Sequence, residues 1–124
     1  MNPQALLEKL PLVRDWIGRT LAEHSKQARP VASYRFPRLG NYYSNELLTT
    51  AKVVEVERVP VPPLSALGLT GFGEFEGGNY GGITFLDTYF VQSGEALRES
   101  LHFHELVHVV QWQHLGVKGS VLEL

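Results

Sequence analysis

Four of the five histidines fall between residues 102 and 114, and two of them close the string His104-Glu105-Leu106-Val107-His108. On a helix, residues four apart lie about 40° apart around the axis, one turn above the other. Two imidazoles so placed can bind one metal ion from one side. Glu105 would lie beside that ion, where it can accept a proton from a metal-bound water. The spacing therefore predicts a metal site on a helix.

The helix expected to carry this motif is apolar around most of its circumference, which is typical of a central, buried helix. Four apolar side chains are expected around the metal, and four others behind the helix. The first set is Leu97, Leu101, Trp112 and Leu115, and the second is Phe103, Leu106, Val107 and Val110. Two buried histidines without a metal would be costly to satisfy. The alternative is that both are hydrogen-bonded core residues.

The residues on either side of the motif predict the elements that position it. Ser93 is expected to cap the motif helix, which would end at Gly116. The segment 82–91, from Gly82 to Val91, is rich in β-branched and aromatic residues and predicts one strand, either covered on both sides or at a sheet edge beside a ligand groove. A second strand is expected at 52–59, and a glycine-rich loop at 68–82 separates the two.

Upstream, the pattern favours helices and a loop. Asn2 and Pro3 predict a helix start, and a second amphipathic helix is expected from Pro11 until the segment 29–30 ends it. The segment 31–50 is expected to be a loop with a short helix at 44–48. Its aromatic residues could line a site, although packing in a small core explains them more simply. Trp16 and Trp112 are expected in the core.

The string HELVHVVQWQHLG, preceded by GITFLDTYFV, resembles the zincin-like metallopeptidases, particularly gluzincins. It is most similar to small bacterial proteins with HELVHVVQ-type active-site helices, over residues 51–116. The resemblance implies an α+β zincin-like fold, with N-terminal helices, a small mixed sheet and a buried HExxH helix. It also implies a zinc ion held by His104 and His108, Glu105 as general base and acid, and a peptide substrate paired with the strand at 82–91.

The third metal ligand departs from the gluzincin pattern, in which a downstream helix supplies a glutamate. Only Glu123 follows the motif, 15 residues after His108, so it is the tentative third ligand. A ligand so near a chain end is poor, and the ending GSVLEL predicts a truncated or naturally short chain. His114 has the metzincin offset, but Gln111 replaces the glycine at which such chains turn. On a continuing helix His114 would point away from the metal.

Three further side chains with possible chemistry receive simpler interpretations. His102 is expected to be a surface or capping residue, and His24 a helix-surface residue. Asp87 could orient a ligand histidine, although a solvent-facing position at a sheet edge is the simpler reading.

Composition narrows the function classes. The chain has 124 residues, which predicts a single domain over 1–124. The formal charge of −2 argues against nucleic-acid or polybasic membrane binding. Without cysteine, disulfide scaffolds and thiolate metal sites are excluded. No targeting or membrane-spanning segment is recognisable, so a cytoplasmic location is expected.

Three functions follow from these observations. The first is a zinc metallopeptidase, in which Glu105 activates the attacking water. The second is a catalytically incomplete zincin-like module that binds a peptide or protein through the glycine-rich loop and strand edge. The third is assembly into a homodimer through apolar surface.

Overall fold

The computed structural model describes residues 3–63, 66 and 81–122. Its helices are α1 (Pro3–Glu8), α2 (Leu10–Glu23), α3 (Asn45–Thr50) and α5 (Glu99–Leu122), and its strands are β1 (Arg29–Pro30), β2 (Lys52–Val56), β3 (Gly82–Phe85) and β4 (Thr88–Gln92). Short 3-10 helices span Val31–Tyr34, Leu39–Asn41 and Ser93–Glu95. Glu123 and nearly all of the glycine-rich loop lie outside the described residues.

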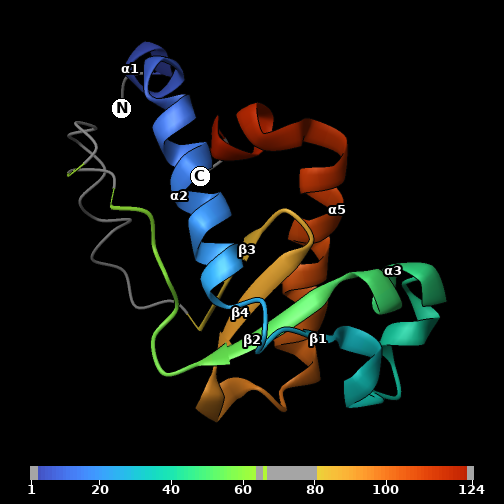
Figure 1. Ribbon diagram of the computed structural model, residues 1–124. Coiled ribbons are helices and arrows are strands. Elements are labelled where there is room, and N and C mark those ends of the chain that lie inside the picture. Colours follow the sequence, from blue (N-terminus) through green and yellow to red (C-terminus); the bar gives the residue numbers. More distant parts are fainter. Residues whose placement is uncertain (1–2, 64–65, 67–80, 123–124) are drawn as a thin grey trace.

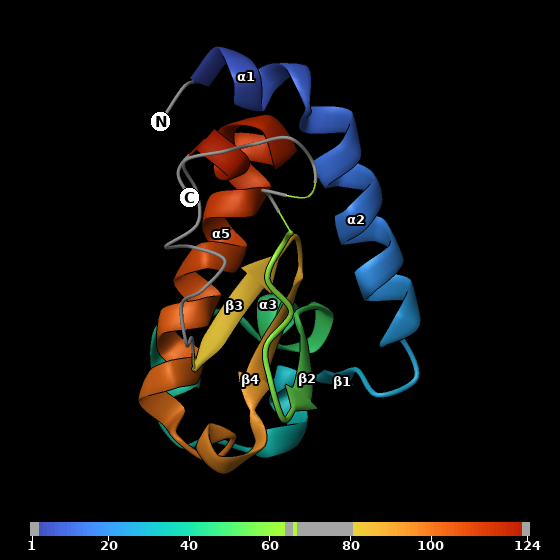
Figure 2. The ribbon, with the colours of Figure 1, turned by 90° about the vertical axis from the view of Figure 1, so that its left-hand side faces the viewer.

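The strands form one mixed sheet in the order β1-β2-β4-β3 (Figures 1 and 2). β2 runs parallel to β4, whereas β1 pairs with β2 and β3 with β4 in antiparallel orientation. This confirms the expected α+β class with a small mixed sheet. β3 lies at one edge, and α5 packs beside it.

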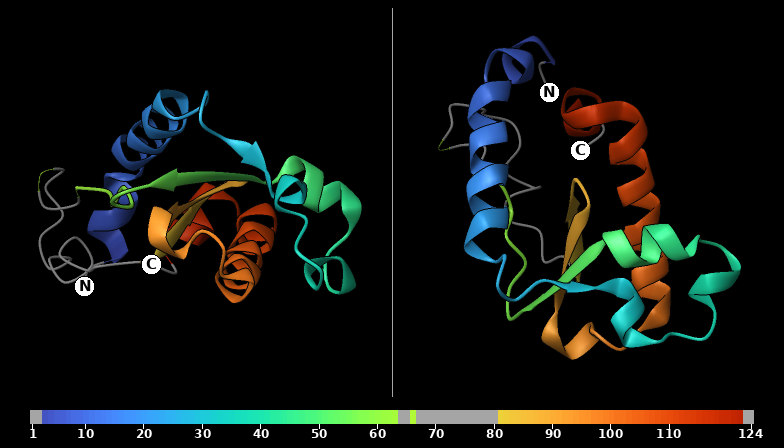
Figure 3. Two further views of the ribbon diagram at one scale, coloured as in Figure 1. Left: turned by 90° about the horizontal axis from the view of Figure 1, so that it is seen from below. Right: turned by 45° about the vertical axis from the view of Figure 1, so that its right-hand side comes forward.

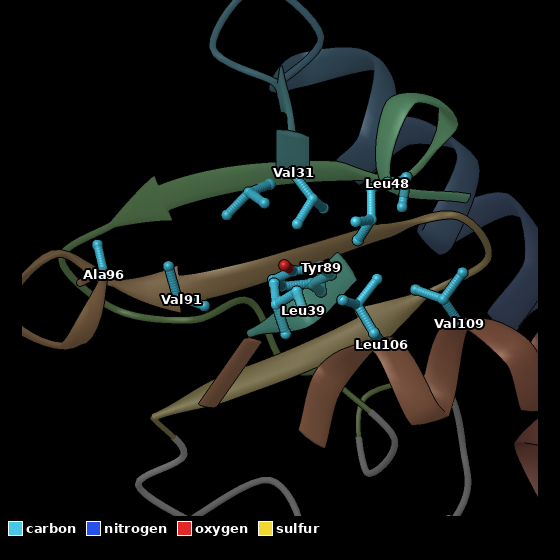
Figure 4. Packing of buried hydrophobic residues seen from close by; sticks show 10 residues of the cluster. Val31, Leu39, Leu48, Tyr89, Val91, Ala96, Leu106 and Val109 are labelled. Atoms are coloured by element: carbon cyan, nitrogen blue, oxygen red, sulfur yellow. The ribbon is translucent and has the colours of Figure 1, made fainter. Parts of the chain in front are cut away.

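Helices cover both faces of the sheet, with α2 on one side and α5 on the other (Figure 3). Alternation along β4 explains this, because Phe90 faces α2 while Tyr89 and Val91 face α5. The α2 side buries Leu10, Val13, Ile17, Val54, Val59, Ile83, Phe85, Phe90 and Trp112. The α5 side buries Val31, Leu39, Leu48, Ala51, Val53, Tyr89, Val91, Ala96, Leu106 and Val109 (Figure 4). The chain thus has two apolar layers that share one sheet.

The N-terminal helices and the short helix after Ser44 confirm the sequence prediction. The Ser44 hydroxyl caps α3 by accepting the Leu47 N–H at 3.1 Å. α2 ends earlier than expected, at Glu23, and β1 occupies the segment where the helix was predicted to stop. His24 is the C-cap of α2 and is half-buried, with its Nδ1–H donating to Thr20 O at 2.8 Å. Its prediction as a surface residue was therefore wrong.

The predicted single strand at 82–91 is a hairpin. β3 and β4 flank a two-residue turn at Leu86 and Asp87, and Leu86 has a left-handed φ of 60°. Leucine is uncommon in this conformation. Because the turn contains neither glycine nor asparagine, it carried no sequence signal of a hairpin. The two predicted environments are divided between the strands: β4 is central, and β3 is at the edge.

The motif helix begins later than predicted and is buried on one side only. Ser93 starts a short 3-10 helix, and α5 begins at Glu99. Gly116 interrupts α5 as expected, with a φ of 69°, although a further helical segment follows it. Leu106 and Val109 are fully buried, whereas Phe103 and Val107 are exposed. No helix in the described part of the chain has the length and apolar character needed to span a bilayer.

Candidate metal centre

His104 and His108 come together on α5 as their spacing predicts. Their Nε2 atoms lie 3.2 Å apart, with the ring planes inclined at 84°. With Zn–N bonds of about 2.0–2.1 Å and a tetrahedral angle, two nitrogens on one zinc lie about 3.3 Å apart. The pair therefore has the nitrogen spacing of two ligands of a single ion. The same distance suits one neutral imidazole donating to the other.

Burial does not force a metal on this pair. His104 is exposed and His108 is half-buried, so neither is a core histidine. The prediction that burying the two histidines would be costly without a metal was wrong, and so was the alternative that they are core residues. The side of α5 that carries His104 and His108 faces away from the sheet. The predicted apolar surround is also incomplete: Leu97 is 83% and Leu115 48% exposed, and only Trp112 is buried. Leu97 lies ahead of α5, in the turn after Glu95.

Glu105 lies about 100° around the helix from His104, in the contact between α5 and β3. Its side chain is buried, and the Thr84 hydroxyl donates to Oε1 at 2.8 Å. The Thr84 carbonyl in turn accepts the Trp112 indole N–H at 3.1 Å. The side chain and the carbonyl of Thr84 therefore both hydrogen-bond to the motif helix, and the Glu105 carboxylate is held between the two elements.

Gly82 allows the strand to approach this carboxylate. A Cβ atom at that position would lie 2.9 Å from Oε2 of Glu105 and 3.1 Å from its Cδ. Real Cβ atoms essentially never come this close to another heavy atom. Gly82 and Thr84, two residues apart on β3, face the same side of the strand. Thr84 donates a hydrogen bond to the carboxylate, and Gly82, which has no side chain, leaves space for it.

The surroundings of Glu105 shift the pKa of its carboxyl in opposite directions. Burial raises the pKa of its carboxyl, and the Thr84 hydrogen bond and the charges of His108 and His104 lower it, with burial the largest effect. The carboxylate thus lies within electrostatic reach of both histidines.

The third ligand is not found within the described residues. No group of three His, Cys, Asp or Glu side chains there could hold a metal ion. Glu123 lies outside these residues, so its role stays a prediction. His114 is exposed on α5 and joins no such group. His104 and His108 alone, of the predicted ligands, are seen side by side.

His102 is fully buried, which contradicts its prediction as a surface or capping residue. Its Nε2 lies 2.7 Å from Ala96 O and its Nδ1 lies 2.7 Å from the Tyr89 hydroxyl. Because the carbonyl can only accept, Nε2 carries the hydrogen and Tyr89 donates to Nδ1. Burial lowers the pKa of His102, chiefly by desolvation. The residue is a core anchor of α5.

Asp87 lies exposed in the hairpin turn and accepts the Thr88 hydroxyl at 3.0 Å. The simpler prediction for it, a solvent-facing residue, is confirmed. Trp112 is buried as expected, and Trp16 packs partly buried against the same cluster. Tyr34, Phe36 and Tyr43 pack partly buried around the second cluster, as core packing predicted, whereas Tyr42 is 68% exposed.

Three residues around the site were missed by sequence reasoning. Gln111 was considered only as a replacement for glycine, yet its Oε1 lies 2.7 Å from Nδ1 of His108. Its position three residues after a predicted ligand on a helix was the available signal. Thr84 and Gly82 gave a weaker signal, because their contact with Glu105 depends on how β3 packs against α5.

Comparison with protein-family models, curated proteins and solved structures found no match to this chain.

Proposed function

We propose that this chain is a zinc-dependent hydrolase of the metallopeptidase class, with a zincin-like arrangement of edge strand and motif helix. The observation that carries the proposal is the pair of Nε2 atoms 3.2 Å apart on α5, next to a buried glutamate fixed by the edge strand. A zinc ion held by His104 and His108 would supply Lewis-acid polarisation and a water of lowered pKa. The donor set of two imidazoles fits zinc, and Glu123 remains the proposed third ligand.

Glu105 would serve as general base and then as general acid. Oε1 already accepts the Thr84 hydrogen, so Oε2 is the atom available to take a proton from the attacking water. The same oxygen would then give that proton to the leaving nitrogen. The Thr84 contact holds the carboxyl group in one orientation during both transfers.

The edge strand supports a peptide as the substrate class. β3 ends the sheet among the described strands, and its Thr84 donates a hydrogen bond to the catalytic carboxylate, while a Cβ atom at Gly82 would lie too close to it. An extended peptide that added to this edge would therefore run beside Glu105. A cytoplasmic location and a homodimer stay predictions from the sequence.

The second candidate is a catalytically incomplete module that binds a peptide or protein. It is favoured by the absence, among the described residues, of any third side chain near enough to complete a metal site. Exposed apolar side chains beside the histidine pair also suit a partner: Phe103 is 38% and Val107 40% exposed.

Metal content and turnover of matched variants separate these functions. We expect about one zinc per chain by plasma mass spectrometry of protein purified without chelator, and loss of that zinc in His104→Ala. Glu105→Gln should keep the zinc and abolish cleavage of a peptide library. Zinc without cleavage in the wild type would favour the binding module. Absence of zinc after its addition, or cleavage retained in Glu105→Gln, would contradict the proposed mechanism.

A further inference from the structure

Gln111 contacts a proposed metal ligand on the side away from the ion. Its amide Oε1 lies 2.7 Å from Nδ1 of His108, while Nε2 of the same ring faces His104. We infer that Gln111 is a positioning residue, which selects the tautomer of His108 that can bind a metal. This inference rests on the proposed function and extends it to a residue outside the HExxH motif.

The chemistry of the contact fixes where the hydrogen resides. A neutral imidazole carries one N–H, and an amide oxygen can only accept. The ring must therefore carry its hydrogen on Nδ1, which leaves the lone pair on Nε2. In the other tautomer the hydrogen on Nε2 would point at the ion and prevent coordination. Partners of this kind fix both the tautomer and the orientation of ligand histidines.

The helix supplies the reach that this contact needs. Residues three apart on a helix are surface neighbours, so Gln111 meets His108 without strain of the chain. Gln111 is exposed and His108 is half-buried, so water competes for Nδ1 once the amide is removed. Water could still accept the hydrogen, but it would not hold the ring. Loss of Gln111 should therefore weaken metal binding and leave the fold intact.

Three variants test this role. Gln111→Leu removes the acceptor, and Gln111→Glu retains an acceptor in a carboxylate. Gln113→Leu is the matched control, because Gln113 is an exposed glutamine on the same helix, about 140° around from His108 when five residues are counted. Each exposed substitution should alter folding little. Circular dichroism and thermal unfolding of the metal-free proteins check that each variant is folded.

The readout is zinc affinity, measured by competition with a chromogenic chelator. We expect Gln111→Leu to bind zinc about 10–100-fold more weakly, and Gln111→Glu and Gln113→Leu to stay at wild-type affinity or above it. Long-range ¹H–¹⁵N NMR of the zinc-free chain should show His108 as the Nδ1–H tautomer, and a shift toward Nε2–H in Gln111→Leu.

The outcomes distinguish this inference from the function on which it rests. Equal zinc affinities of wild type and Gln111→Leu would overturn the role of Gln111 and leave the metal site standing. The same holds if Gln113→Leu weakens zinc as much as Gln111→Leu does. A wild-type chain that binds no zinc would overturn the proposed function and this role together.

Discussion

At the scale of single residues, the buried carboxylate of Glu105 has space because Gly82 on the edge strand has no side chain. A Cβ atom at Gly82 would lie 2.9 Å from Oε2, and the Thr84 hydroxyl donates to Oε1. A shift of the carboxylate away from a larger neighbour would therefore disturb the Thr84 hydrogen bond. Glycine at this position is explained by the close approach of strand and carboxylate rather than by a special backbone angle.

Substituting Gly82 by Ala tests this close approach. The new Cβ would lie 2.9 Å from Oε2, so either Glu105 or β3 must shift. We expect the free energy of unfolding to fall by about 1–3 kcal/mol, as for other overpacked sites. Gly81→Ala is the control, because a Cβ there meets nothing within 4 Å. Urea unfolding of both variants checks the prediction, and equal stabilities would contradict it.

At the scale of elements, β4 and α5 are joined by a buried polar contact within an otherwise apolar layer. The Tyr89 hydroxyl donates to His102 Nδ1, and His102 donates to Ala96 O before α5 begins. Aromatic rings of Tyr34 and Phe36 lie 4.8 and 4.6 Å from the His102 ring. This contact fixes the first turn of the helix that carries His104 and Glu105.

Removing the Tyr89 hydroxyl should therefore loosen the packing of α5 on the sheet. Tyr89→Phe leaves the buried Nδ1 of His102 without its donor, and we expect a loss of about 1–3 kcal/mol in unfolding free energy. Tyr42→Phe is the matched control, because Tyr42 is 68% exposed and should change stability by less than about 0.5 kcal/mol. Chemical denaturation measures both. The buried contact is not stabilising if the two variants behave alike.

Elements were predictable from sequence where one local signal decides them. The short helix predicted at 44–48 is α3, Gly116 interrupts α5, and the strand predicted at 52–59 is β2, which ends at Val56. The hairpin was missed because its turn places Leu86 in a left-handed conformation that glycine usually adopts. Likewise, a late start of α5 at Glu99 removed Leu97 from the predicted metal surround.

The candidate site divides in the same way. His104 and His108 meet because helix geometry alone dictates it, so their spacing sufficed. Burial of Glu105 and His102 depends on partners from β3 and β4, which no local pattern in α5 reveals. The predicted third ligand, Glu123, lies outside the described residues.

At the scale of the whole molecule, one helix serves two purposes. The side of α5 that faces the sheet completes a core layer, and the opposite side presents the histidine pair. His102 and His104, only two residues apart, are therefore in opposite environments: one is fully buried and one is exposed. The pH dependence of the fold should follow the buried histidine.

Desolvation lowers the pKa of His102 in the folded chain. The groups that face it or act on its charge are Tyr89, Tyr34, Glu55, Glu99 and Arg29. In the unfolded chain a histidine has a pKa of about 6.5. Above that pH both states are neutral at this residue, and its contribution to stability is complete. As the pH falls through about 6.5, the unfolded chain binds a proton at this residue that the folded chain does not bind, so stability falls.

We therefore expect the zinc-free chain to unfold at a lower temperature at pH 5.5 than at pH 7.5. His102→Gln should be less stable at pH 7.5 but should lose less on acidification, because it has no proton to take up at this position. ¹H–¹⁵N NMR should show His102 still neutral, with its hydrogen on Nε2, at a pH just below the ordinary histidine pKa of about 6.5. A His102 ring that protonates at or above the ordinary histidine pKa of about 6.5 would contradict the prediction, because the sheet would then not be shielding it from water.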